Sequence, residues 1–212
     1  IISPLSQWGP AVDGSIQKYP YDPRLSERSM NDAGFVKNPD GFYANARGRF
    51  SPELKTTVDR EDEGSVMASG LKRAGFDINF AVLPAALSID PEARVTFPAM
   101  FTSITSQGEG SLPGFTTAQI PKADNNWRTG NNRGGWSSPE YDRLMEAFTS
   151  TLDPKERATE VAQMMKIFTD ELPAISLLFL AQPYAYASAL HGVLPVAPEG
   201  DITWNLHEWE YR

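Results

Sequence analysis

The chain has 212 residues, 41% of them hydrophobic, which is enough to bury the core of one large domain or two small ones. Its net charge is −8, from 27 acidic and 19 basic residues without a basic block, which argues against a nucleic-acid-binding protein. The absence of cysteine excludes disulfides and thiolate catalysis but leaves the compartment open, and no apolar run reaches the length of a membrane-spanning helix.

The first part of the chain is predicted to be a loop that leads into a short helix. Residues 1–22 contain three prolines and show no helical periodicity. We expect a helix over 23–33, because Asp22 suits the N-cap and Pro23 suits the first helical position. The Asn-Pro-Asp-Gly run at 38–41 is typical of a turn.

A strand, a helix and a second strand are predicted next. The first strand covers 49–58, with Pro52 favouring an edge or an irregular start. Apolar residues then recur at helical spacing up to Gly75, which is a typical helix stop. Residues 76–82 alternate between apolar and polar side chains, as a half-buried strand does.

Two helices are predicted in the second half of the chain, after a long polar stretch at 103–136. The first helix begins at Ser138-Pro139 and the second at Asp153-Pro154, each with apolar residues on one face. The apolar run 174–181 is predicted to be a buried strand, and the tail from Leu190 shows no clear period.

The titratable residues show no pattern typical of a catalytic or metal site. His191 and His207 are the only histidines, and their spacing matches neither a metal-ligating motif nor a Ser-His-Asp triad. Carboxylates such as Glu140 and Glu156 suit helix caps and solvated faces better than acid–base chemistry. The glycines at 108–114 have the wrong spacing for a dinucleotide loop. We therefore expect no catalytic residue, metal or cofactor.

Several short motifs occur together in a fixed order. They are the run 131–144 with its Asn-Asn and Ser-Pro-Glu-Tyr-Asp-Arg-Leu segments, Asp153-Pro154-Lys155-Glu156-Arg157, Phe168 to Ile175, and Leu190-His191-Gly192-Val193. Upstream lie Tyr21-Asp22-Pro23, Ala33-Gly34-Phe35 and Asp40-Gly41. In this order they resemble the C-terminal signature of the family 5 extracellular solute-binding proteins, to which dipeptide- and oligopeptide-binding proteins belong.

The resemblance implies an α/β lobe of the type II periplasmic-binding-protein kind, with a mixed sheet flanked by helices. Family members have two lobes and more than twice this length, so we interpret the chain, which begins at Ile1 without a signal segment, as an excised piece. Residues 1–183 are expected to form the C-terminal lobe. Residues 184–212 are expected to be a tail that in full-length members returns to the first lobe.

The polar stretch at 103–136 is the predicted ligand-binding region, because it combines large aromatic faces with directional hydrogen-bonding groups. The candidate residues are Thr102, Ser103, Thr105, Phe115, Trp127, Arg128, Asn131, Asn132 and Trp136. For Trp136, packing beneath the following helix is an equally good interpretation.

Peptide-binding members often carry an aspartate just after the strand equivalent to 99–103, whereas Glu109 is the first acid here. A neutral or anionic solute, or a peptide held mainly through its backbone, is therefore equally compatible.

The function implied by the resemblance is the capture of a peptide or other small solute between two lobes. The implied partners are the missing N-terminal lobe and the membrane permease of an ABC importer, and the implied location is the periplasm.

Two alternative functions stay open from the residues alone. One is a hydrolase or transferase domain, which would need a nucleophile–base or carboxylate pair. The other is a ligand-sensing module built on the same lobe.

Overall fold

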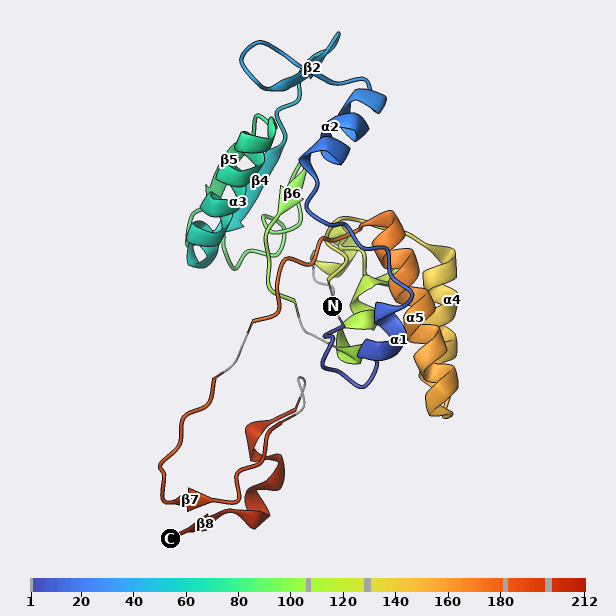
Figure 1. The fold of residues 1–212 in the computed structure, drawn as a ribbon, viewed down its shortest axis with the longest axis vertical. Coiled ribbons are helices and arrows are strands. Elements are labelled where there is room, and N and C mark those ends of the chain that lie inside the picture. Colours follow the sequence, from blue (N-terminus) through green and yellow to red (C-terminus); the bar gives the residue numbers. More distant parts are fainter. Residues whose placement is uncertain (1, 106–107, 128–130, 181–182, 197–199) are drawn as a thin grey trace. The chain divides into compact units, whose positions relative to one another are not determined.

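The computed structural model describes residues 2–105, 108–127, 131–180, 183–196 and 200–212. The chain divides into two compact units (Figure 1). The helical unit comprises Ile1–Lys18, Thr105–Ile120 and Thr129–Arg212, and the sheet unit comprises Tyr19–Ile104 and Pro121–Arg128. The expected α/β class is confirmed, with parallel and antiparallel strands lying in separate small sheets of the described chain.

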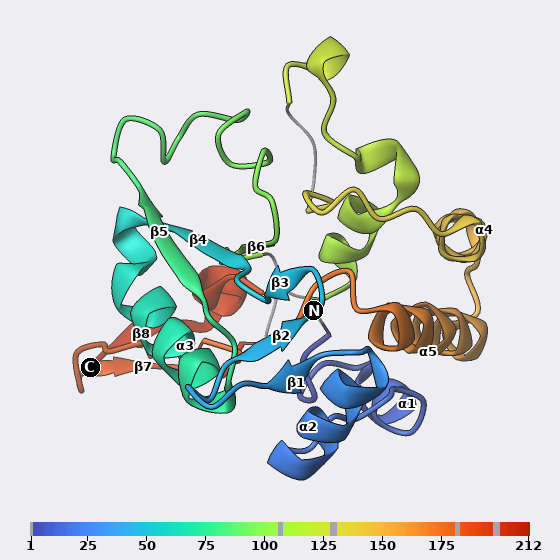
Figure 2. The ribbon, with the colours of Figure 1, turned by 90° about the horizontal axis from the view of Figure 1, so that it is seen from above.

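The sheet unit is built around a parallel sheet covered on one face by a helix (Figure 2). The sheet contains β4 (Glu53–Thr57), β5 (Asn79–Leu83) and β6 (Met100–Phe101) in the order β5-β4-β6, and α3 (Glu61–Ala74) connects β4 to β5. The predicted helix stop is confirmed, because Gly75 is the left-handed C-cap of α3. The two predicted strands are confirmed over shorter ranges than expected.

Close packing between α3 and the sheet depends on a glycine. A Cβ at Gly64 would lie 2.8 Å from the Phe80 ring and 3.1 Å from Cγ2 of Thr56. The absence of a side chain lets the N-terminal half of α3 approach β4 and β5. Leu54 of β4 then packs with Ala68 of α3 in the unit's small core.

An antiparallel meander and a helix complete the sheet unit. The meander contains β1 (Val36–Lys37), β2 (Tyr43–Asn45) and β3 (Gly48–Arg49). The helix α2 (Pro23–Asp32) is confirmed where it was predicted, and the Asp22 side chain accepts from the backbone N–H groups of Arg24 and Leu25. None of the residues of α2 is buried, so this helix contributes little to the unit's core.

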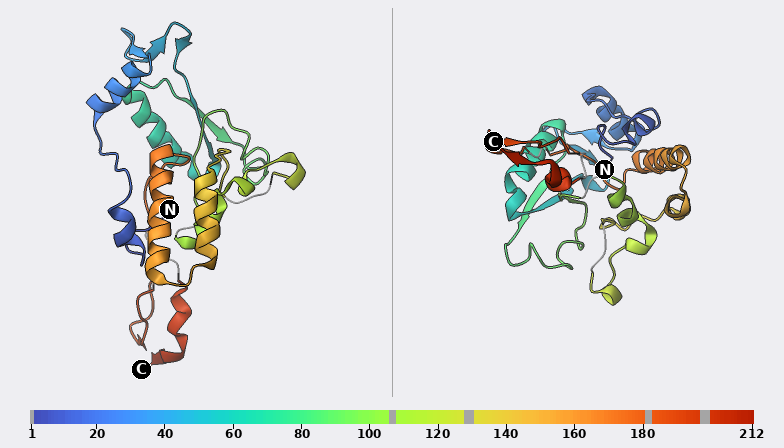
Figure 3. Two further views of the ribbon diagram at one scale, coloured as in Figure 1. Left: turned by 90° about the vertical axis from the view of Figure 1, so that its right-hand side faces the viewer. Right: turned by 90° about the horizontal axis from the view of Figure 1, so that it is seen from below.

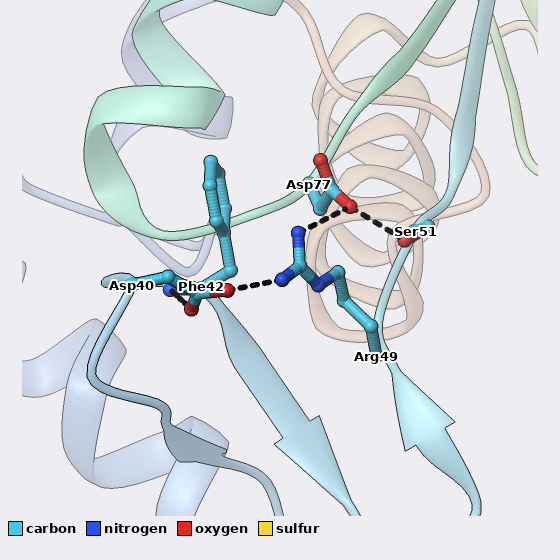
Figure 4. Close-up of polar contacts among 5 residues, drawn as sticks. All are labelled: Asp40, Phe42, Arg49, Ser51 and Asp77. Carbon is cyan, nitrogen blue, oxygen red and sulfur yellow. Dashed lines mark hydrogen bonds and ion pairs between the residues drawn. The ribbon is translucent and has the colours of Figure 1, made fainter.

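Arg49 attaches the meander to the rest of the sheet unit (Figure 4). Its guanidinium donates to the carboxylates of Asp40 and Asp77, and Ser51 Oγ donates to Asp77 Oδ2 at 3.0 Å. The hydrogen bonds from Ser51 and Arg49 hold the pKa of Asp77 below its ordinary value of 3.8. Because the pKa of Asp77 is lower in the folded state than in the unfolded state, this cluster stabilises the fold at neutral pH. The stabilisation is lost as the pH falls through the lowered pKa of the folded state.

We therefore expect the Asp77→Asn variant to lose less stability than the wild type when the pH is lowered from about 6 to 3. The measurement is the melting temperature of both proteins across that range. Asp32→Asn, which removes an exposed carboxylate of α2, is the matched control and should follow the wild type. An Asp77→Asn protein whose acid dependence equals that of the wild type would contradict this role of Asp77.

The helical unit is built on two helices that lie side by side (Figure 3, left). They are α4 (Pro139–Ser150) and α5 (Pro154–Glu171), and the predicted N-caps Ser138 and Asp153 both accept hydrogen bonds from backbone N–H groups of their first turns. The short helix α1 (Gly9–Asp13) packs against α5 and was not predicted. The buried core includes Trp8, Leu112, Phe115, Tyr141, Leu144, Phe148, Val161, Met164 and Phe168.

The prediction of a buried strand over 174–181 is wrong for the part that the structure describes. Residues 174–180 contain no strand, and their apolar side chains are exposed, with Ile175 69% and Leu178 67% accessible. A run of apolar residues indicates burial only where a partner surface covers it, and within the described residues of this chain none does.

The end of the chain forms a small structure closed by its own contacts. It contains β7 (Leu190–His191) and β8 (Glu210–Tyr211), which pair antiparallel, and the 3₁₀ segment η5 (Ile202–Glu208) between them. Asn205 is fully buried; its Nδ2 donates to the Gly192 carbonyl at 2.6 Å and its Oδ1 accepts from Trp209 Nε1 at 2.9 Å. A Cβ at Gly192 would lie 2.3 Å from the Glu208 carbonyl, so this position requires glycine.

None of the helices in the described part of the chain combines the length and the apolar character needed to cross a membrane.

Candidate functional site

The candidate site follows from the order of the parallel strands. The chain leaves β4, forms β5 on one side of it, and then returns to form β6 on the other side. In open α/β sheets, ligands bind outside the carboxyl ends of the strands at the point where the strand order reverses. That point lies at the ends of β4 and β6, where the chain continues into Val58 and Thr102.

Two of the predicted residues, Thr102 and Ser103, lie at this point. The backbone N–H of Thr102 donates to the Lys55 carbonyl at 2.9 Å, and its hydroxyl donates to Oγ1 of the fully buried Thr56 at 2.5 Å. Thr102 is thus tied into β4, whereas Ser103 is exposed. We infer that Thr102 orients the segment that follows β6, and that Ser103 is the better placed of the two to contact a solute.

Charged residues follow β4 at the same edge and were missed by the sequence reasoning. The hydrogen bond from the Thr57 side chain holds the pKa of Asp59 below its ordinary value, and the nearby positive charges of Arg60 and Arg94 act in the same direction. Arg60 Nη1 donates to Glu63 at 2.8 Å. The sequence analysis did not single these residues out as candidates, because their place at this edge depends on strand order and not on a local motif.

Trp127 stands in an unusual backbone conformation in the sheet unit. It follows the 3₁₀ turn η4 (Ala123–Asn125), and both Asn126 and Trp127 have left-handed φ angles, 54° and 57°. A left-handed conformation is strained for a bulky residue and persists where the surroundings impose it, often at functional sites. Here the Trp127 N–H donates to the Lys122 carbonyl at 2.9 Å, which fixes the backbone that carries the half-buried side chain.

Asn132 organises the loop that precedes α4. It is 2% exposed, and its Nδ2 donates to the carbonyls of Phe115, Thr116 and Trp136 at 3.2, 2.9 and 2.7 Å. Its Oδ1 accepts from the Trp136 N–H at 2.9 Å. In this structure both ends of the amide bond the backbone of the same unit.

Phe115 and Trp136 are part of the core of the helical unit. The Phe115 ring is 4% exposed and meets the Phe168 ring edge to face at 4.9 Å. Trp136 packs edge to face on Tyr141 at 4.9 Å, and its Nε1 donates to the Glu171 carboxylate at 2.6 Å. The interpretation that Trp136 packs beneath the following helix therefore has direct geometric support.

The structure separates the predicted residues into two groups. Thr102, Ser103 and Trp127 lie in the sheet unit, and Thr105, Phe115, Asn131, Asn132 and Trp136 lie in the helical unit. The N–H of Asn131 donates to the Gly114 carbonyl at 2.9 Å, and the hydroxyl of Thr105 is enclosed. Arg128 lies outside the described residues. The role of all nine predicted residues in binding a solute stays a prediction.

Glu109, the first acid after β6, is engaged inside the helical unit. Its Oε2 accepts from Trp8 Nε1 at 3.0 Å and from Arg157 Nη2 at 3.3 Å. Arg157 also donates to the Phe148 carbonyl at 2.8 Å and lies over the Phe148 ring at 3.7 Å. Glu109 is therefore a structural residue that joins the 3₁₀ segment η2 (Glu109–Phe115) to α4 and α5, and its carboxylate is already neutralised by Arg157.

Among the described residues, no three His, Asp or Glu side chains are placed together to hold a metal ion.

Comparison with solved structures finds the fold of this chain in periplasmic binding proteins. It matches an oligopeptide-binding protein of Thermus thermophilus, solved with a pentapeptide, with 28% identity and a TM-score of 0.71 over 92% of this chain and 35% of the other. It also matches NikZ of Campylobacter jejuni, solved with Ni(L-His), with 20% identity and a TM-score of 0.70 over 96% of this chain and 42% of the other. The chain thus spans less than half the length of these proteins.

Sequence comparison adds a more distant relative, an uncharacterized lipoprotein of Mycobacterium tuberculosis that is 25% identical over 80 residues, which are 38% of this chain and 14% of the lipoprotein. No family model matches the chain. The solved neighbours are oligopeptide-, dipeptide- and nickel-binding proteins, and they confirm the resemblance and the type II lobe that the sequence indicated. The Thermus and Campylobacter neighbours are both binding proteins that were solved with a bound solute.

Proposed function

We propose that the chain is the C-terminal lobe of the substrate-binding component of an ABC importer, and that it encloses a small solute together with a first lobe. The observation that supports this most directly is the match to the Thermus protein, which extends over 92% of this chain at 28% identity. We propose that the solute binds to this lobe at the carboxyl ends of β4 and β6, where the strand order reverses. The proposal includes a periplasmic location and a permease as partner.

In this proposal the solute stabilises a closed form, and the closed form docks on the permease. The complete gene product should therefore show a higher melting temperature and a smaller radius of gyration when its solute is added. Probes are di- to pentapeptides, with free or acetylated amino ends, and neutral oligosaccharides. If instead a compound is turned over, and turnover is lost on mutating a single acid or histidine, the proposal fails in favour of an enzyme.

Residues 174–180 and 183–186, which are exposed, and the tail are proposed to dock on the first lobe. Large apolar side chains in the described part of this segment are exposed: Ile175, Leu177, Leu178, Phe179, Leu180, Tyr184 and Tyr186. Trp204 and Leu206 of η5 are also more than half exposed. Exposed apolar surface of this kind is typical of an interaction site. We propose that its partner is the first lobe, which corresponds to the additional length of the neighbours.

We expect limited proteolysis of the isolated chain to cut between 174 and 189, because this stretch has no secondary structure in its described part. The fragment from Leu190 onward should resist further digestion, since the buried Asn205 side chain bonds both Gly192 and Trp209. Mass spectrometry of the early products provides the measurement. In the complete protein the same bonds should be protected. Early cleavage there, at the rate seen in the isolated chain, would contradict docking on a first lobe.

A further inference from the structure

The part of the sequence that follows α5 carries no charge over a long stretch. From Leu172 to Leu190 it contains no Asp, Glu, Lys, Arg or His, whereas the chain as a whole has a net charge of −8. Charged side chains are one of the devices that keep exposed strand-like segments from pairing with other chains. A second copy of this stretch therefore meets no like charge here, despite the negative charge of both copies.

Residues 174–180 expose apolar side chains, and part of their backbone is unbonded. α5 ends at Glu171, and Leu172 then adopts a left-handed conformation before Pro173, which prevents the helix from continuing. The backbone groups of residues 177–180 make no hydrogen bond within the described chain. Five large apolar side chains of this segment are 40–69% exposed: Ile175, Leu177, Leu178, Phe179 and Leu180.

The composition of residues 174–180 suits pairing with an identical segment. They include no proline, no glycine and no charged residue, which is the composition of short segments that form strands with copies of themselves. An antiparallel arrangement relates the two copies by a two-fold axis and closes the assembly at a dimer. The axis then passes through the middle of the apolar run, close to Leu177 and Leu178.

We propose that two copies of this chain associate through residues 174–180, which pair as antiparallel strands. A second copy offers a segment of the same length and hydropathy, equally without charge. Pairing removes roughly 300 Å² of apolar surface from each copy, if about 60 to 120 Å² belongs to each fully exposed side chain. Stable interfaces bury about 800 Å² per partner, so the association is weak and reversible. The first lobe of the proposed function competes for the same segment, but the proposal does not depend on that function.

The first test is sedimentation equilibrium of the chain from about 5 to about 500 µM, the range in which an interface below the standard size should form. The average mass should rise from that of one chain to that of two. Leu178→Lys should weaken the association about tenfold or more, because it places two like charges beside the axis. Leu152→Lys is the matched control and should change nothing, since Leu152 is 92% exposed but lies in the loop between α4 and α5.

The second test uses the absence of cysteine from the chain, which makes a single introduced thiol an unambiguous probe. Leu178→Cys should form a disulfide-linked dimer about tenfold faster than Leu152→Cys in the same mild oxidant. The reason is that residues opposite each other in an antiparallel pair bring their Cβ atoms to about 5 Å, close to the distance that a disulfide requires.

A chain that stays monomeric over the whole concentration range would overturn the proposal. So would a dimer that Leu178→Lys and Leu152→Lys affect equally, equal cross-linking rates of the two cysteine variants, or growth into large assemblies without a dimer. Because the chain is used alone, each of these results leaves solute capture and docking on a first lobe to be tested in the complete protein.

Discussion

Replacing Asn132 by alanine is expected to destabilise the helical unit by about 2 to 4 kcal/mol, which is large for a single residue of a loop. Its amide is buried and satisfies the carbonyls of Phe115, Thr116 and Trp136 while accepting from the Trp136 N–H. Alanine leaves these backbone groups buried without partners. The measurement is chemical denaturation of the isolated chain, followed by the fluorescence of its tryptophans.

The matched control is Asn131→Ala, one residue earlier in the same loop. Asn131 contacts the loop through its backbone N–H, which donates to the Gly114 carbonyl and is retained by alanine. We expect a change within about 0.5 kcal/mol, as for most substitutions outside the core. If both variants lose the same stability, the effect belongs to the loop as a whole and not to the Asn132 amide.

The helices were predictable because their signals are local. Asp22, Ser138 and Asp153 each precede a proline, and each accepts the backbone N–H groups that a helix start leaves unpaired. The position of such a residue is decided by its immediate neighbours in sequence. These helix starts therefore agree with the structure, while α1, in a proline-rich segment without periodicity, was missed.

The apolar segment 174–180 shows where local reasoning fails. Its composition matches that of a buried strand, but a strand forms only where another strand supplies hydrogen-bond partners. Whether such a partner strand exists depends on the rest of the fold, including any part of the protein that lies outside this chain.

The candidate site was predictable in part. Thr102 and Ser103 directly follow β6 in the structure, whereas Asp59 was not singled out, because its place at the same edge depends on β6 pairing with β4. Asn132 illustrates the opposite difficulty. A polar residue in a glycine-rich loop suits either a ligand or the backbone, and only the geometry shows that this amide serves the backbone.

The two tryptophans of the loop region should respond differently to truncation in the complete protein. Trp136 is built into the core through Tyr141 and Glu171, whereas Trp127 is half-buried and held in a strained left-handed conformation at the end of a turn. Trp136→Ala is therefore expected to lower the melting temperature strongly, because it removes a large packed side chain. Trp127→Ala keeps the left-handed backbone strain, which only glycine would relieve, and it loses less packing because the ring is half-buried.

We expect Trp127→Ala to weaken solute binding by about 1 to 3 kcal/mol, the scale of one large buried contact, and to leave the melting temperature nearly unchanged. The measurement is calorimetry of the complete protein with a solute found in the melting-temperature screen, beside thermal melts of both tryptophan variants. Trp136→Ala is the control for nonspecific damage to the fold. Unchanged affinity of Trp127→Ala, together with a large drop in melting temperature, would make Trp127 a core residue and place the binding site elsewhere.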